Sequence, residues 1–138
     1  MEEQEWSREQ KLQAVCELLR EQVDHYDWVG FYVTRPGTRE LELGPFSGDP
    51  TEHVLIPFGR GICGQAAERE STVVVQDVGA ESNYLSCSVN VRSEIVVPVI
   101  VDGKVQGEMD IDSHALSPFT GEDEKLLQAV CELVAPLL

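Results

Sequence analysis

The spacing of hydrophobic residues changes twice along this chain, and this change restricts the possible folds more than any other feature. Near both ends, apolar residues recur at intervals of three and four, as on one face of a helix, from Ser7 to Val23 and from Thr120 to Leu137. Between these segments they alternate with period two, which is typical of half-buried strands. Terminal helices around a strand-rich middle predict an α+β domain with a mostly antiparallel sheet. We expect both helices to pack on one surface.

Capping signals mark where the two helices begin. Ser7 and Gln10 have the spacing of a capping box, in which each side chain bonds the other residue's backbone N–H. Thr120 is followed by Glu122 and Asp123, which place negative charge in the first turn of the second helix. Helix starts at these positions are therefore predicted.

The segment 28–33 has two distinct faces. Its odd-numbered positions form a purely apolar face, whereas the other face carries Trp28 and Tyr32 with only Gly30 between them. Two interpretations of these aromatic residues remain open. They belong to an ordinary core, or they form the floor of a site for a small cationic ligand. A second strand is expected over residues 41–46.

A hairpin is predicted later in the chain. Asp102-Gly103 is suited to the positive φ angles of a two-residue turn, and the arms run over residues 94–101 and 104–112. Along the second arm, one face carries the carboxylates and the other face the apolar side chains: Glu108, Asp110 and Asp112 against Val105, Met109 and Ile111.

Two interpretations of these carboxylates also remain open. They form a solvated outer face, or together with Glu94 on the paired arm they line an acidic pocket. Such a pocket could hold a ligand ammonium group or a divalent cation. Crowding would raise the pKa of at least one carboxyl until it could donate a proton.

The four cysteines fall into different contexts. Cys16 and Cys131 lie in the apolar helix stripes and are expected to be buried. Cys63 follows a Gly-rich turn near a helix N-terminus, where the dipole would favour a thiolate, although a small buried cysteine fits the turn equally well. Cys87 lies in residues 77–92, a polar stretch with little periodicity, so a reactive thiol is favoured there. The histidines lack zinc-site spacing, and we assign no metal.

Composition narrows the class of protein. The chain has 138 residues, which suits one domain over residues 1–138. Its 25 acidic residues outnumber the 10 basic ones and give a formal charge of −15, so nucleic acid and anionic membranes are not expected partners. No apolar run approaches the roughly 20 residues of a membrane span, and the acidic N-terminus does not resemble a secretory signal. We expect a cytoplasmic protein.

Five strings occur in order: DWVGFYV, LELGPFSGDP, IPFGRGICG, SEIVVPV and GEMDIDS. In this order and at these separations they resemble the free methionine-R-sulfoxide reductases, which are built on a GAF-type fold. The similarity runs from about Asp27 to Phe119. It implies a central antiparallel sheet with helices on one face and a loop-covered ligand pocket on the other.

The resemblance assigns roles to particular residues. Cys87 lies six residues before the Ser93-Glu94-Ile95 motif, the spacing of the family's catalytic cysteine, and Cys63 matches the cysteine of its GxCG turn. Five further positions match those that line the family's substrate pocket: Trp28, Tyr32, Glu94, Asp110 and Asp112.

The implied reaction is the reduction of free, not peptide-bound, methionine sulfoxide. A Cys87 thiolate would attack the sulfur while a protonated Glu94 or aspartate assists loss of oxygen, which leaves a sulfenic acid. Cys63 would convert it to a disulfide that thioredoxin or another thiol reductant reduces. The carboxylates would hold the substrate's ammonium group, and no cofactor is expected.

The chain departs from the family pattern at two places. Typical members carry a third cysteine, often the resolving one, where this chain has His53, and one extra residue lies between Pro50 and Ile56. The loop SNYLSCS also differs from the family's usual His- and Asp-containing version. Cys63 is therefore the recognisable resolving candidate.

Two other functions compete with the reductase. A non-catalytic GAF module would bind a small amino-acid-like or cyclic-nucleotide ligand, with the flanking helices available for a homodimer. An acidic cation-binding protein would use Glu108, Asp110 and Asp112 for calcium or magnesium. Replacement of Cys87 by serine would abolish turnover by an enzyme but leave ligand binding by a sensor nearly unchanged.

Overall fold

The computed structural model describes residues 6–85 and 90–138. Within this part of the chain the helices are α1 (Arg8–Gln22), α2 (Gly61–Arg69) and α3 (Gly121–Val134). The strands are β1 (Trp28–Thr34), β2 (Glu40–Ser47), β3 (Leu55–Pro57), β4 (Val73–Val75), β5 (Ser93–Val101) and β6 (Lys104–Ser113). Short 3-10 helices lie at Val78–Ala80 and Ala135–Leu137.

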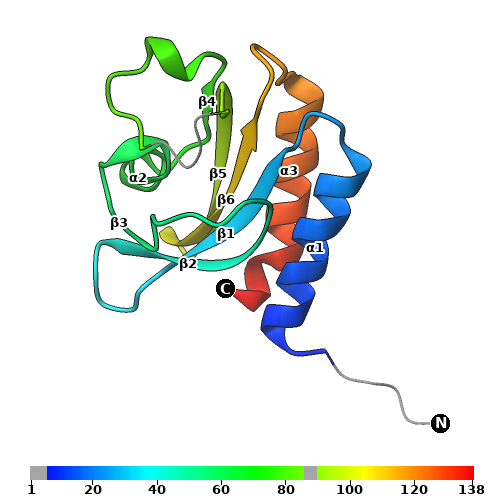
Figure 1. Ribbon diagram of the computed structural model, residues 1–138. Coiled ribbons are helices and arrows are strands. Elements are labelled where there is room, and N and C mark those ends of the chain that lie inside the picture. The colour runs from blue at the N-terminus through cyan, green and yellow to red at the C-terminus, as the bar shows by residue number, and fades with distance from the viewer. Residues whose placement is uncertain (1–5, 86–89) are drawn as a thin grey trace, which may run out of the picture.

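The strands form one antiparallel sheet in the order β3-β2-β1-β6-β5-β4. Helices α1 and α3 lie side by side on one face of this sheet, and the short α2 lies on the other (Figure 1). The prediction of an α+β domain with both terminal helices on one surface is confirmed. The sheet therefore has two covered faces of different character.

Both predicted helix starts are confirmed by reciprocal caps. The Gln10 backbone N–H donates to Ser7 Oγ at 3.1 Å, and the Ser7 N–H donates to Gln10 Oε1 at 2.7 Å. At α3, Thr120 is the N-cap and its N–H donates to Asp123 Oδ2 at 2.8 Å. Each cap satisfies backbone donors that have no partner within the helix.

The hairpin of β5 and β6 has the predicted turn. Asp102 and Gly103 adopt positive φ angles of 53° and 76°. One detail of the prediction is wrong: Val105 packs on the α2 side of the sheet, not with Met109 and Ile111. A register shift near Val99 inserts one extra residue into β6, and this bulge reverses the face of the side chains beyond it.

Two hydrophobic clusters fill the two faces. The larger one joins the sheet to α1 and α3 and includes Val29, Phe31 and Met109, all fully buried. Cys16 and Cys131 lie in this cluster, as expected for cysteines with a packing role. The smaller cluster joins the sheet to α2 and contains the pocket-side residues described below.

Strand β3 was not predicted. It has only three residues, lies at the edge of the sheet and pairs with β2 through Leu41 and Ile56. A strand of this length has too few residues for a period to be recognised, and Pro57 masks it further. None of the helices described is long and apolar enough to cross a membrane.

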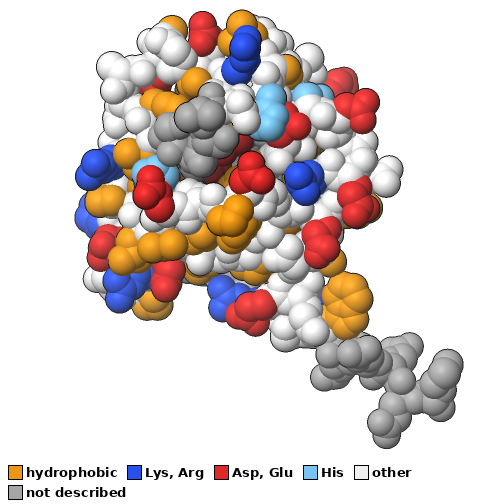
Figure 2. All heavy atoms as spheres, in the orientation of Figure 1, with side chains coloured by type: hydrophobic (Ala, Val, Ile, Leu, Met, Phe, Trp, Pro, Cys, Tyr) orange, Lys and Arg blue, Asp and Glu red, His pale blue; other side chains and the backbone are white. Residues whose placement is uncertain are grey.

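Acidic side chains are distributed over the visible surface among hydrophobic and uncharged ones (Figure 2). This distribution agrees with the formal charge of −15.

Candidate functional site

The register of the central strands brings the predicted site residues together on the α2 face. Across β1 and β6, the Cα partners are Trp28 with Asp112, Gly30 with Asp110, and Tyr32 with Glu108. Glu94 on β5 lies opposite Asp112. Because side chains alternate along a strand, these positions share one face, and the sequence predicted this grouping correctly.

The carboxyl groups on this face are buried. Glu94 is 4% exposed, Glu108 0%, Asp110 1% and Asp112 1%. The interpretation of a solvated outer face is therefore wrong, and the acidic pocket is the correct alternative. Helix α2 and the segments around it remove these groups from water.

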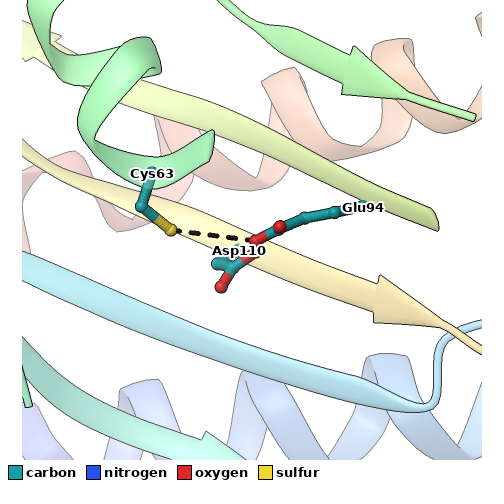
Figure 3. Close-up of side chains that lie close together, drawn as sticks. All are labelled: Cys63, Glu94 and Asp110. Carbon is teal, nitrogen blue, oxygen red and sulfur yellow. Dashed lines mark hydrogen bonds between the residues drawn. The ribbon is translucent and has the colours of Figure 1, made fainter. Parts of the chain in front are cut away.

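Cys63 completes the pocket from the opposite side. It is the third residue of α2, where the GRGICG turn directs its side chain toward the sheet (Figure 3). Its thiol donates to Glu94 Oε2 at 3.9 Å. The Cys63 sulfur and carboxylate oxygens of Glu94 and Asp110 all lie within 4.8 Å of one another. The same cavity is lined by Tyr32, His53, Ile56, Arg60, Gly61, Ile62 and Leu85.

Burial and crowding keep protons on this acidic cluster. Burial raises the pKa of Glu108 well above its usual range, and the neighbouring Asp110 raises it further, whereas the interaction with the Cys63 thiol acts in the opposite direction. Burial also raises the pKa of Asp110, although interactions with Glu94 and Cys63 act in the opposite direction. Neither carboxyl oxygen of Glu108 makes a hydrogen bond of normal geometry to the described residues. Burial and crowding therefore favour the protonated form of these carboxyls.

The same environment raises the pKa of the Cys63 thiol, whereas the helix dipole alone would lower it. Burial raises the pKa of its thiol, and the charges of Asp110 and Glu108 raise it further. The helix dipole favours a thiolate, but its effect is smaller than the cost of burying a second negative charge beside carboxylates. Of the two interpretations of Cys63, this environment favours the buried thiol over the thiolate.

Trp28 and Tyr32 lie in one buried cluster on the α2 face but line neighbouring cavities. The Trp28 indole stacks on Phe46 with ring centroids 5.4 Å apart, and its N–H donates to the Asp49 carbonyl at 2.9 Å. The indole lies across Gly30, where a Cβ would come within 2.3 Å of the ring. Trp28 and Asp112 line a cavity beside that of Tyr32 and Cys63, together with Arg20, Asp27, Asp49, Val91 and His114.

His53 occupies the position where related sequences are expected to carry a third cysteine. Its backbone carbonyl accepts a hydrogen bond from the Tyr32 hydroxyl at 2.9 Å, and the residue lines the Cys63 cavity. The position thus belongs to the pocket. Cys87, the predicted nucleophile, lies outside the described residues.

Asn83 is a structural residue of the site that the sequence did not single out. Its side-chain oxygen accepts from the Gly61 N–H at 2.9 Å, and its amide donates to the Gly59 carbonyl at 2.9 Å. Gln65 donates to the Asn83 carbonyl at 2.8 Å. These bonds fasten the segment that leads toward Cys87 to the start of α2. The polar composition of that segment was the only available signal.

Comparison with known proteins gives consistent results. The GAF domain family model matches residues 7–138. The free methionine-R-sulfoxide reductase of Escherichia coli is 40% identical over 120 residues, which cover 87% of this chain and 69% of that protein.

Solved structures agree with this match. The type II free methionine-R-sulfoxide reductase of Thermoplasma acidophilum superposes with a TM-score of 0.90 at 42% identity, covering 94% of this chain and 91% of that one. The Neisseria meningitidis enzyme, solved in complex with its substrate, gives 0.88 at 38% identity, with 95% and 77% coverage.

Proposed function

This chain belongs to the free methionine-R-sulfoxide reductases of the GAF domain family, and from that premise we propose that it reduces free L-methionine-R-sulfoxide to methionine. One observation supports this function most strongly: a neutral thiol and several buried carboxyl groups face one another in a single pocket. Sulfoxide reduction needs a proton at the departing oxygen, and burial in this pocket favours the protonated form of its carboxyls by raising the pKa of Glu108 and Asp110.

In the proposed first step, the Cys87 thiolate attacks the sulfoxide sulfur. A protonated carboxyl, Glu94 or Asp110, gives its proton to the sulfoxide oxygen. The oxygen is transferred to Cys87, methionine leaves, and the thiol becomes a sulfenic acid. The sulfoxide has gained two electrons, which the cysteine has lost.

In the second step, Cys63 attacks the Cys87 sulfenic acid, so that an S–S bond forms and water leaves. Cys63 must lose its proton for this attack, and Glu94 Oε2, 3.9 Å from its sulfur, is placed to accept it. A dithiol reductant of the thioredoxin class then returns both cysteines to thiols. This cycle needs no third cysteine, in agreement with His53 at that position.

The acidic and aromatic side chains are proposed to select a free amino acid. A carboxylate pair such as Asp110 and Asp112 would hold the substrate's ammonium group, while Trp28, Tyr32 and Glu94 contact the rest of the molecule. A peptide bond removes the ammonium charge, so a peptide-bound sulfoxide would lose this attraction and leave the buried carboxylates uncompensated.

The cellular compartment and the oligomeric state are also part of the proposal. We place it in the cytoplasm, where thiol reductants keep cysteines reduced. Exposed apolar residues on the outer helices, Leu18 at 57% and Leu133 at 79%, offer a surface for a homodimer.

Turnover is tested by NADPH consumption coupled through thioredoxin and its reductase. The substrates are free L-methionine-R-sulfoxide, its S epimer and the N-acetylated R epimer. We expect activity with the free R epimer alone, loss of that activity in Cys87→Ser, and retention in the matched core variant Cys131→Ala. Activity seen only with dithiothreitol would place the defect in resolution by Cys63. No turnover with either reductant would refute the reductase and favour a ligand-binding module.

A further inference from the structure

The pocket contains the donor set of a metal site as well as that of a proton donor. We propose that Cys63, Glu94 and Asp110 bind a thiophilic divalent cation, with Zn²⁺ as the type case, and that the bound ion closes the pocket to substrate. Figure 3 shows the three side chains converging from α2, β5 and β6. Sulfur, carboxylate and carboxylate are all ligands that Zn²⁺ accepts.

The distances are close to those of a bound ion. Zn–S and Zn–O bonds of roughly 2.0–2.3 Å at a tetrahedral angle place two ligand atoms about 3.5 Å apart. The Cys63 sulfur and Glu94 Oε2 are already 3.9 Å apart, and the set with Asp110 lies within 4.8 Å. Side-chain adjustments that together shorten these separations by about 1 Å would complete three ligands, leaving the fourth position to water.

A second observation points to a cation independently of this cluster. Glu108 is fully buried two residues before Asp110 on the same strand face, and its oxygens make no hydrogen bond of normal geometry to the described residues. It lies near enough to the Cys63 thiol to influence it. The Cys63 thiol, a weak donor, interacts with this carboxyl and lowers its pKa. A buried carboxyl with so weak a donor is costly, and a divalent ion beside it would relieve that cost.

The thiol decides which cations are preferred. Ca²⁺ and Mg²⁺ bind through oxygen ligands alone, whereas a sulfur ligand favours Zn²⁺ and related soft ions. This separates the proposed site from a calcium or magnesium site on Glu108, Asp110 and Asp112. Binding would displace the Cys63 proton and those on the carboxyls, so affinity would rise with pH.

The consequence for catalysis rests on the proposed function. An ion coordinated by Cys63 would hold the resolving thiol and the proton-donating carboxyls at once. Neither step of the reaction could then proceed, and a rise in free Zn²⁺ would reversibly stop turnover. A chelator would restore it.

The binding test uses Co²⁺ as a spectroscopic probe on the full chain carrying Cys87→Ser, so that the loop thiol cannot contribute. We expect the intense near-ultraviolet charge-transfer band of cobalt–thiolate coordination, displaced by Zn²⁺ but not by Mg²⁺. Adding Cys63→Ser should abolish the band and lower Zn²⁺ affinity by more than the roughly 10–100-fold that loss of an outer-shell partner costs. The matched variant Cys131→Ala should retain both.

A band absent from the Cys87→Ser protein, or one that persists after Cys63→Ser, would overturn the proposal. If Cys63→Ser does not fold, Asp110→Asn takes its place. That variant should keep the cobalt–thiolate band while binding Zn²⁺ at least about 10-fold more weakly, and unchanged affinity would refute the site. The cobalt band tests metal binding by absorbance and does not depend on turnover. The reductase assay on chelator-treated protein tests the proposed function separately, so the two proposals can fail independently.

Discussion

The two faces of the sheet are formed by the same strands but bury different kinds of side chains. The face toward α1 and α3 carries apolar side chains such as Val29, Phe31 and Met109, whereas the face toward α2 buries four carboxyl groups and a thiol. The first arrangement removes apolar surface from water and stabilises the fold. The second desolvates acids and costs stability, which is typical of a site retained for its chemistry. The period-two alternation of a strand makes this division possible.

The helix face also contains a polar contact that supports the fold. Asp123 at the start of α3 accepts hydrogen bonds from the Tyr26 hydroxyl at 2.6 Å and from His25 Nε2 at 2.9 Å. The contact fixes α3 to the segment that enters β1. Its carboxylate is fully satisfied, unlike Glu108 on the other face. The comparison of Asp123 with Glu108 shows that a buried acid stabilises the fold only where hydrogen-bond donors surround its carboxylate.

The largest effect on stability is expected on the helix face. Leu127→Ala removes a fully buried side chain from the cluster beneath α3. We expect a loss of about 2–5 kcal/mol in the free energy of unfolding, with unchanged kcat in the protein that remains folded. Urea unfolding measures the loss. Leu126→Ala, whose side chain is 41% exposed, is the matched control. An equal loss of stability in that variant would contradict the conclusion that the buried face of α3 stabilises the fold.

A smaller effect is expected at the cap of α3. Asp123→Ala removes the acceptor of Tyr26, His25 and the Thr120 backbone, and should cost about 0.5–2 kcal/mol at neutral pH. Glu122→Ala, an exposed acid in the same turn, should cost less.

The Asp123 contribution should also depend on pH in a defined direction. Burial acts to raise the pKa of Asp123, but hydrogen bonds from Tyr26, Thr120 and His25 outweigh it and lower that pKa. Its stabilisation is therefore present above the unfolded pKa of about 4 and is lost as the pH falls through the folded pKa. The stability gap between wild type and Asp123→Ala should narrow on acidification. A gap that stays constant down to acid unfolding would contradict this assignment.

On the α2 face, a substitution is expected to raise the free energy of unfolding instead of lowering it. Glu108→Gln replaces a buried acid with a neutral isostere, which should raise stability by roughly 1 kcal/mol because folding no longer has to hold an acid protonated above its usual pKa. Because burial raises the pKa of Glu108, the stability lost by the wild type as pH rises should be absent in this variant. Thermal unfolding at several pH values measures it. Glu42→Gln, an exposed strand position, should change little, and destabilisation by Glu108→Gln would refute the contrast.

The smallest effect on stability and a clear effect on turnover are expected at Asn83. Asn83→Ala breaks two hydrogen bonds between its segment and the start of α2 and should cost about 1 kcal/mol or less. We expect kcat to fall roughly 10-fold or more, since small displacements of reacting groups are costly, with a smaller change in KM. Ser82→Ala, exposed in the same segment, is the control. Unchanged kcat in Asn83→Ala would exclude a positioning role.

Much of the fold could be predicted because local signals were strong. Capping pairs fixed the helix starts, the Asp102-Gly103 turn set the hairpin, and alternation in 28–33 assigned side chains to faces. Strand β3 and the bulge that turns Val105 were missed, because a three-residue strand has no period and a bulge is decided by pairing with a neighbouring strand.

The sequence by itself determined the α+β class, the order of the helices and the hairpin, and the fact that acids and aromatics share one side of the central strands. These properties depend on residue spacing along the chain. Only the tertiary structure decided that the acids are buried, that Cys63 is a thiol beside Glu94, and that Trp28 lines a neighbouring cavity. The pKa of a side chain depends on which groups surround it and how much water reaches it, and contacts between distant segments set both.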